Sequence, residues 1–171
     1  GYNVAVGAEA GALMTTGIQN TIIGGLAGDS LTTGSYNVAL GMGALTNDDV
    51  GSRTTAIGYD ALSSQNYASA TDSYNTAVGY DAGKAVTTGV QNTFIGGNSA
   101  IYNTTGANNV AVGRSALQAN TTASNNTAVG YDCLKANTTG INNVALGALA
   151  LDANTTSSYN IAIGYGALTG A

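Results

Sequence analysis

The residues with the clearest capacity for chemistry are four acidic side chains that recur at one position of a pattern repeated along the chain: Glu9, Asp60, Asp81 and Asp132. Asp60 and Asp81 belong to successive copies of the pattern, so their carboxylates could lie close enough together to share a calcium ion, which prefers oxygen ligands. A solvated rim of charge on a turn accounts for the same residues without a metal. We favour that interpretation and expect no bound metal or cofactor.

Catalytic chemistry has little support in the composition. The chain contains no histidine, which excludes histidine-based triads, imidazole bases and histidine metal sites. The glycine-rich stretch 24–28 lacks the lysine and the helix pattern of a phosphate-binding loop. Cys133 stands at a position where the other copies carry alanine or serine, so we expect it to be a buried substitute for alanine. We expect that the protein is not an enzyme.

Tyrosine supplies nearly all the aromatic side chains, and four tyrosines directly follow a recurring glycine: Tyr59, Tyr80, Tyr131 and Tyr165. Exposed tyrosine rings can stack on sugar rings or add contact area to a receptor. The same rings can also cover the edges of a structure without binding anything. These four tyrosines are the candidate receptor-contact residues.

Charge and hydropathy argue against two classes of partner. The net charge is −5, and the four basic residues are scattered along the chain as Arg53, Lys84, Arg114 and Lys135. Nucleic-acid binding needs clustered lysine and arginine, so none is expected. Hydrophobic residues make up 44% of the chain, yet no apolar run approaches the ~18–20 residues that span a bilayer. We therefore expect no membrane insertion in this segment.

All these residues occupy fixed places in an internal repeat. A unit of asparagine, a β-branched residue, a mostly small residue, an aliphatic residue and glycine occurs ten times, at a spacing of 17 residues broken once by four extra residues near 65–74. Positions below are counted from the first residue of each unit: Asn3, Asn20, Asn37, Thr54, Asn75, Asn92, Asn109, Asn126, Asn143 and Asn160. The stretch 10–25 returns with few changes at 82–97, which indicates a duplicated block. We expect residues 1–171 to form a single repeat domain, a fragment of a longer fibrous chain.

The columns of the repeat predict its fold. The fifth position is glycine in all ten copies, which indicates a positive φ or a close approach of two backbones in every repeat. The first-position asparagines are best explained as a hydrogen-bonded ladder between coils. Short β-branched runs, glycines and "NTTG" turns exclude helices. We predict an all-β fold, a parallel β-solenoid of ten coils of about 17 residues.

The strand within each unit also predicts how many chains assemble. The second and fourth positions are Thr, Val, Ile or Leu, whereas the third is alanine in eight copies and is replaced by Ile22 and Phe94 in the other two. Side chains alternate along a strand, so we expect the second and fourth positions to face the interior and the third to face outward. Strands apolar on both faces are buried on both faces. We therefore expect an oligomer in which Ile22 and Phe94 pack between chains.

The unit, as in "NTAVGYDA" at 75–82 and "NVAVGRSA" at 109–116, resembles the head repeats of trimeric autotransporter adhesins (YadA-like) and the related repeats of bacteriophage tail fibres. The likeness covers the whole chain, although Thr54 replaces the usual asparagine in one unit. The resemblance implies a left-handed β-roll and a homotrimer. It also implies an extracellular location, on a virion tail fibre or a bacterial cell surface, and attachment to a cell-surface receptor or glycan.

Two alternative functions stay open at this stage. A self-polymerising extracellular filament would stack such domains end to end. An ice-binding β-solenoid would present regular ranks of threonine, for which the recurring pairs are candidates: Thr15/Thr16, Thr32/Thr33, Thr87/Thr88, Thr104/Thr105 and Thr121/Thr122. Adjacent threonines in a strand point to opposite faces, and the glycine after many of these pairs indicates a turn, so we favour the attachment fibre.

Overall fold

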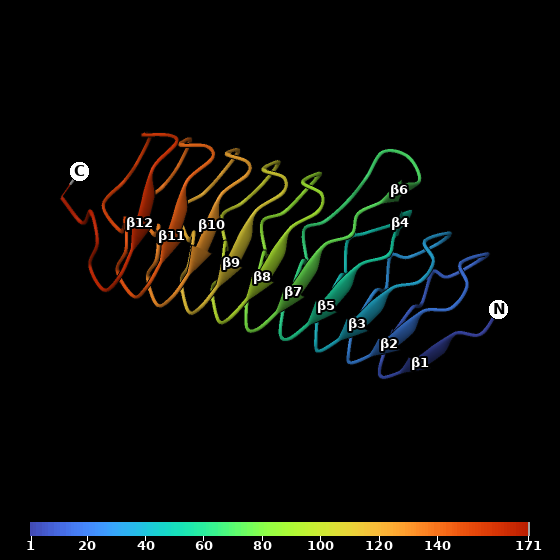
Figure 1. Cartoon of the computed structure of the whole chain (residues 1–171). Helices are drawn as coiled ribbons and strands as arrows, with labels where there is room; N and C mark the ends of the chain where they lie inside the picture. The colour runs from blue at the N-terminus through green and yellow to red at the C-terminus, as the bar shows by residue number, and fades with distance from the viewer. Residues whose placement is uncertain (171) are drawn as a thin grey trace.

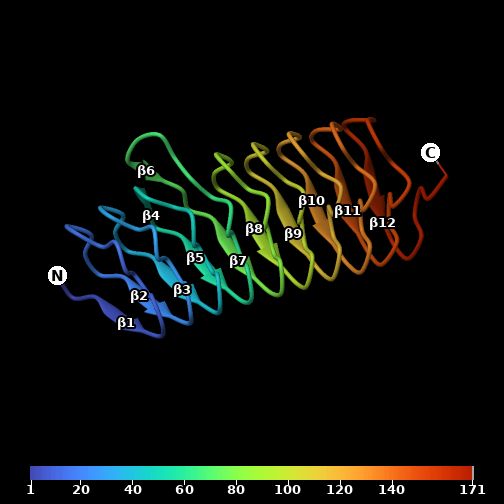
Figure 2. The same cartoon turned by 180° about the vertical axis from the view of Figure 1, so that it is seen from behind.

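The computed structural model describes residues 1–170. These residues form an all-β parallel solenoid of about nine turns, with ~17 residues per turn and no helix (Figure 1). The predicted fold class and repeat length are therefore confirmed. The coils follow one another along a single stack, and the two ends of the described chain lie at its opposite ends (Figure 2).

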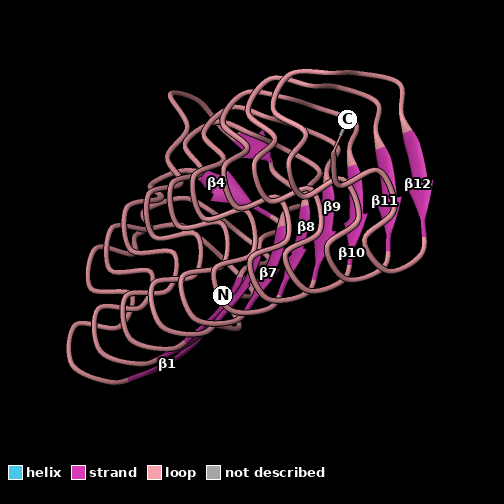
Figure 3. Cartoon of the chain, turned by 90° about the vertical axis from the view of Figure 1, so that its left-hand side faces the viewer, coloured by secondary structure: helices cyan, strands magenta, loops and turns pink. Residues whose placement is uncertain are grey.

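One strand from each coil contributes to a ten-stranded parallel sheet. Figure 3 shows strands β7 to β12 following one another along one side of the stack. Each strand pairs in register with the next coil, as Val110 pairs with Thr127. The strands of this sheet, in order, are β1 (Val4–Val6), β2 (Thr21–Ile23), β3 (Val38–Leu40), β5 (Thr55–Ile57), β7 (Thr76–Val78), β8 (Thr93–Ile95), β9 (Val110–Val112), β10 (Thr127–Val129), β11 (Val144–Leu146) and β12 (Ile161–Ile163). Two shorter strands, β4 (Gly51–Ser52) and β6 (Thr71–Asp72), form a separate parallel pair.

The fifth-position glycine directly follows each main strand, and both reasons predicted for that glycine are confirmed. Gly113 has a φ of 132°, in the left-handed half of conformational space that favours glycine. A Cβ atom added to Gly113 would lie 2.4 Å from the carbonyl oxygen of Gly130 in the next coil. The same conflict recurs along the column, so the stacking distance itself requires glycine.

The prediction of which strand face points inward was wrong. Beyond the first coil, third-position residues are buried in the interior of their own chain, including Ile22, Phe94 and Ala111, each 0% exposed. Second- and fourth-position side chains are instead exposed or half-buried. A 17-residue coil is narrow, and its interior is already occupied by the alanine and leucine side chains of the eighth and ninth positions. Ile22 and Phe94 therefore fill the core and offer no surface to another chain.

The two large third-position residues fit because a ninth-position glycine lies against each, Gly28 of the same coil against Ile22 and Gly83 of the preceding coil against Phe94. A Cβ added to Gly28 would lie 3.1 Å from Cδ1 of Ile22, and one added to Gly83 would lie 2.7 Å from Cδ2 of Phe94. Most other coils carry alanine at the third position and leucine at the ninth, as in Ala128 and Leu134. Large and small side chains thus exchange places to keep the interior filled at constant density.

The predicted asparagine ladder is confirmed. The side-chain oxygen of Asn109 accepts a hydrogen bond of 3.0 Å from the backbone N–H of Asn126, its counterpart in the next coil. The amide nitrogen of Asn109 donates 2.9 Å to the carbonyl of Ala123 near the end of its own coil. Each buried asparagine therefore closes one coil and joins it to the next, which satisfies backbone groups that would otherwise be buried without partners.

The four extra residues near 65–74 are divided between two places. Gly51 pairs with Thr71 and Thr55 pairs with Thr76, so three of the extra residues precede Thr71 and the fourth follows it. The first group forms the loop that projects from the stack just before β6 (Figure 1). The regular coil path resumes at β7 without any shift in the register of the main sheet.

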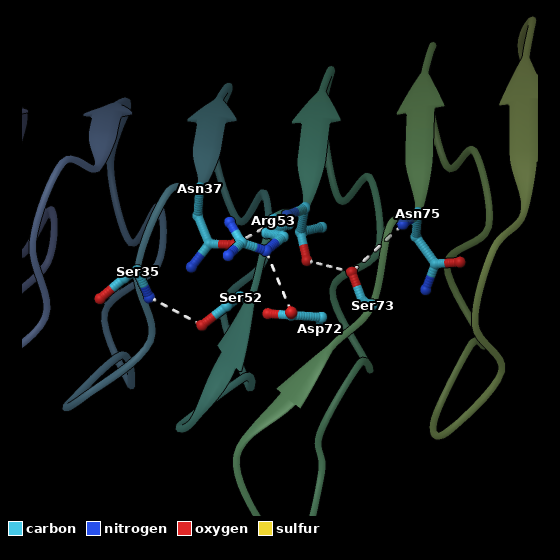
Figure 4. A network of polar contacts seen from close by, with 8 residues as sticks. Ser35, Asn37, Ser52, Arg53, Asp72, Ser73 and Asn75 are labelled. Carbon is cyan, nitrogen blue, oxygen red and sulfur yellow. Dashed lines mark hydrogen bonds and ion pairs between the residues drawn. The ribbon is translucent and has the colours of Figure 1, made fainter.

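The remaining extra residue, Ser73, replaces a missing rung of the ladder. Thr54 stands where other coils have asparagine and cannot reach the next coil in the same way. The Ser73 hydroxyl lies 2.6 Å from the Thr54 hydroxyl and accepts a hydrogen bond of 3.2 Å from the backbone N–H of Asn75 (Figure 4). The insertion thus supplies the acceptor that the substitution at Thr54 removed.

Candidate functional site

The predicted receptor-contact tyrosines lie on a ridge formed by the sixth-position side chains. Tyr59, Tyr80, Tyr131 and Tyr165 are all exposed, by 42% to 81%. Tyr59 and Tyr80 belong to successive coils, and their rings stack with centroids 5.2 Å apart and planes within 9° of parallel. The structure brings these two together. Tyr131 and Tyr165 are separated from them, and from each other, by coils without tyrosine at this position.

Arg114 belongs to the same ridge, as the sixth-position residue of the coil before that of Tyr131. The guanidinium carbon of Arg114 lies 5.6 Å from the Tyr131 ring centroid, and its Nη1 donates 3.4 Å to the Tyr131 hydroxyl. Sequence reasoning treated Arg114 only as a scattered charge. Its place one repeat before Tyr131, in the same column, is the signal that could have identified this pair.

A second arginine, Arg53, forms cation–π contacts with tyrosine rings beside β4 and β6. The Arg53 guanidinium carbon lies 4.8 Å from the Tyr36 ring centroid and 6.0 Å from that of Tyr74, in the coils on either side. Its Nε forms an ion pair of 3.0 Å with Asp72 (Figure 4). Hydrogen bonding to the Asp72 carboxylate raises the pKa of Arg53. Planar side chains of adjacent coils therefore stack along the axis of the solenoid at both places.

Lysine side chains form ion pairs with three of the four seventh-position acidic residues. Nζ of Lys84 lies 2.9 Å from Asp60 and 3.2 Å from Asp81, so it bridges the two carboxylates once considered for calcium. Hydrogen bonding to Asp60 raises the pKa of Lys84. Asp132 is held in the same way by Lys135, at 2.9 Å. Within residues 1–170, no group of three or more acidic or cysteine side chains converges as metal ligands do.

Buried titratable groups have structural explanations. Cys133 is fully buried, as predicted, and burial raises its thiol pKa to about 11. Asp48 is also buried, and desolvation raises the pKa of its carboxyl group despite a 2.7 Å hydrogen bond from Gln65. Burial likewise raises the pKa of Tyr67, whose hydroxyl donates to the carbonyl of Gly89. None of these groups faces an enclosed pocket, since the described chain has none.

A further surface without a partner in the chain is the outer face of the main sheet, which consists of the second- and fourth-position side chains of its ten strands. We call it the outer sheet face. Its fourth position is Val, Ile or Leu in every coil, and its second is Val, Thr or Ile. Leu40, Ile95 and Leu146 are 43%, 39% and 46% exposed. At ~4.8 Å per strand the face is roughly 43 Å long, and it carries no charge.

The threonine pairs lie in bends and not in the main strands. The first hydroxyl of each pair is engaged within the chain, as when Thr104 donates 3.1 Å to the carbonyl of Thr121 in the next coil. The second threonine of each pair, such as Thr105, is exposed. A single exposed rank therefore exists, with one threonine per coil over most of the stack.

Comparison of the chain with protein-family models, with curated proteins and with solved structures found no match. Among residues 1–170, no helix has the length and apolar character needed to cross a membrane.

Proposed function

We propose that this chain is a structural and adhesive segment of an extracellular homotrimeric fibre, either a bacteriophage tail fibre or a bacterial surface adhesin, which attaches to a cell surface. The observation that carries the proposal is the outer sheet face. Apolar patches of this extent on soluble proteins mark interaction sites. An uncharged sheet face of Val, Ile, Leu and Thr side chains, exposed or half-buried over the length of the stack, favours burial against copies of the same chain.

Association through this face explains why it lacks charge while the rest of the surface does not. The ion pairs of Lys84 and Lys135 lie on a different column of the coil. Three identical stacks around one axis would bury their outer sheet faces together, since a closed symmetric arrangement leaves no apolar surface exposed. The resemblance of the repeats to trimeric adhesin heads supports three as the number of chains.

Attachment is the role of the ridge of exposed tyrosine and arginine. The stacked pair Tyr59 and Tyr80 and the further exposed rings of the ridge present several contact points, and three copies on one fibre multiply weak contacts into useful avidity. The backbone ladder makes the support stiff. The partner is a cell-surface receptor or glycan, and the fibre needs neither a cofactor nor catalytic residues for this task.

Binding of the fluorescently labelled protein to a panel of bacterial cells and purified surface polysaccharides tests the attachment role. We expect binding to at least one of them that is weakened by Tyr80→Ser but unchanged by Tyr102→Ser, because Tyr102 is 56% exposed and lies outside the ridge. Equal binding by both variants would contradict a role for the ridge. No binding to any cell or polymer would contradict attachment.

Ice binding is the second candidate function, because the exposed second threonines form a regular rank. Thr105, Thr122 and Thr139 occupy three successive coils. The rank is only one threonine wide, and the adjacent hydroxyls are used inside the chain. Thermal hysteresis measured on the folded protein discriminates this function from attachment, for which we expect none.

A further inference from the structure

We infer that the ridge contains a binding slot for a carboxylated pyranose ring, at Gly97 between Tyr80 and Arg114. The inference rests on the proposed attachment function for its biological meaning, and it names the ligand class. Gly97 is the sixth-position residue of its coil, so the ridge has no side chain there. A Cβ added to Gly97 would have no atom within 4 Å. We call this opening the Gly97 gap.

Two planar groups border the Gly97 gap. On one side, the Tyr80 ring is stacked on Tyr59, so its other face is turned toward the coil of Gly97. On the other side, Arg114 lies against Tyr131 and donates to its hydroxyl through Nη1, and its side chain makes no other hydrogen bond within residues 1–170. The coil of Tyr80 and the coil of Arg114 are separated by two strand spacings, about 9.6 Å. That distance leaves room for one ring that stacks on Tyr80 at about 4.8 Å and carries a substituent toward Arg114.

The chain already contains the filled version of this arrangement. Arg53 lies between Tyr36 and Tyr74, at 4.8 and 6.0 Å from their ring centroids. A planar group inserted between two neighbours one coil away on either side is therefore compatible with the geometry of the stack. At Gly97 the two outer groups are present and the inner one is missing.

Charge selects the class of ring. In residues 1–170, the carboxylates of this surface are paired, Asp81 with Lys84 and Asp132 with Lys135, whereas no acidic side chain forms an ion pair with Arg114. An unpaired guanidinium beside the gap favours a carboxylate, to which it can donate two parallel hydrogen bonds. The tyrosine face favours the apolar C–H face of a sugar. A pyranose that bears a carboxylate, as in a uronic acid, satisfies both groups.

Nuclear magnetic resonance of the ¹⁵N-labelled protein, titrated with methyl β-D-glucuronide and separately with methyl β-D-glucoside, tests this inference. We expect the glucuronide to shift the backbone amide signals of Gly97 and Asn98 most strongly. We also expect it to bind roughly tenfold more tightly than the uncharged glucoside. Largest shifts elsewhere on the surface, or equal affinity for both sugars, would overturn the inference.

Two variants and a matched control locate the site. Gly97→Tyr fills the gap with a ring and should abolish glucuronide binding, whereas Gly25→Tyr makes the same change in the same column, beside Ala8 and Met42, and should leave binding intact. Arg114→Gln changes only an exposed side chain and should reduce the affinity roughly tenfold. Retained binding in Gly97→Tyr, or equal loss in Gly25→Tyr, would overturn the slot.

These measurements use a small soluble sugar, so they do not depend on trimer formation or on adhesion to cells. A chain that binds glucuronide at Gly97 but remains monomeric and attaches to no cell surface would contradict the proposed fibre and support the slot. A trimer that adheres to cells but binds no glucuronide would contradict the slot alone.

Discussion

The side-chain oxygen of Asn92 accepts a hydrogen bond of 3.0 Å from the backbone N–H of Asn109 in the following coil, and Asn109 makes the same bond to Asn126. The relationship repeats along the stack and is interrupted at Thr54, where Ser73 supplies the acceptor. Side chains that bind backbone groups in this way set the distance and register between coils, and the fold depends on them as much as on its narrow apolar core.

Replacing one ladder residue should therefore destabilise the whole stack. Asn109→Ala removes the acceptor for the buried N–H of Asn126 and the donor to Ala123, and we expect it to lower the free energy of unfolding by about 2–3 kcal/mol. Urea denaturation followed by circular dichroism measures the effect. Thr105→Ala is the control, because Thr105 is exposed in the preceding bend, and it should change stability by less than about 0.5 kcal/mol. Equal effects would show that the ladder contributes little.

The exchange of large and small side chains predicts a compensating pair of substitutions. Phe94→Ala alone should leave a cavity and cost about 3–5 kcal/mol. Gly83→Leu alone should also destabilise, because its Cβ would lie 2.7 Å from Phe94. The double variant restores the alanine and leucine of the other coils, so it should be more stable than either single variant. Thermal unfolding of all four proteins tests this, and losses that simply add would contradict the packing account.

Asp48 should make stability depend on pH in a direction opposite to that of most carboxylates. Its pKa in the folded chain is raised by burial above the ordinary value of 3.8. Between the pKa of the unfolded chain and the higher pKa of the folded chain, Asp48 is ionised in the unfolded chain but still protonated in the folded one. The free energy of unfolding therefore falls as pH rises through this interval, and the full loss is reached above the folded-state pKa.

Asp48→Asn removes this penalty. Asparagine fits here, because at the equivalent position Asn103 accepts from Asn120 and donates to the carbonyl of Gly106. We expect the variant to gain stability over the unmodified protein as pH is raised from about 4 to 7, measured by urea denaturation at each pH. A difference that is constant with pH, or that reverses, would contradict a buried ionisable Asp48.

Much of the fold could be predicted because the repeat states each requirement many times. Glycine at the fifth position of every repeat unit predicted the backbone geometry at that point, and asparagine at the first position predicted the hydrogen-bonded ladder. The direction of the strand faces could not be read from the strand alone, because an alanine column is compatible with either side. It is decided by the residues across the coil, and the presence of Gly83 beside Phe94 was the available signal.

The surface chemistry was harder to predict, because it depends on pairs of residues in adjacent coils. Asp81 and Lys84 lie three residues apart on one coil, but the contact of Lys84 with Asp60 is seen only when the seventh position of one coil is placed beside the tenth position of the next. The Gly97 gap likewise becomes visible only when Tyr80 and Arg114 are placed two coils apart on one ridge. Sequence columns identify which side chains share a surface, and the structure shows which of them touch.

The central claim is that the outer sheet face is buried between three chains. Light scattering after size-exclusion chromatography measures the mass of the particle directly, and circular dichroism on the same sample establishes that it is folded. We expect a compact β-rich particle of three chains, which Val112→Lys, a charge placed in the middle of the face, converts to folded single chains. A folded monomer of the unmodified protein would contradict the claim, and long polymers would indicate instead a filament built by end-to-end stacking.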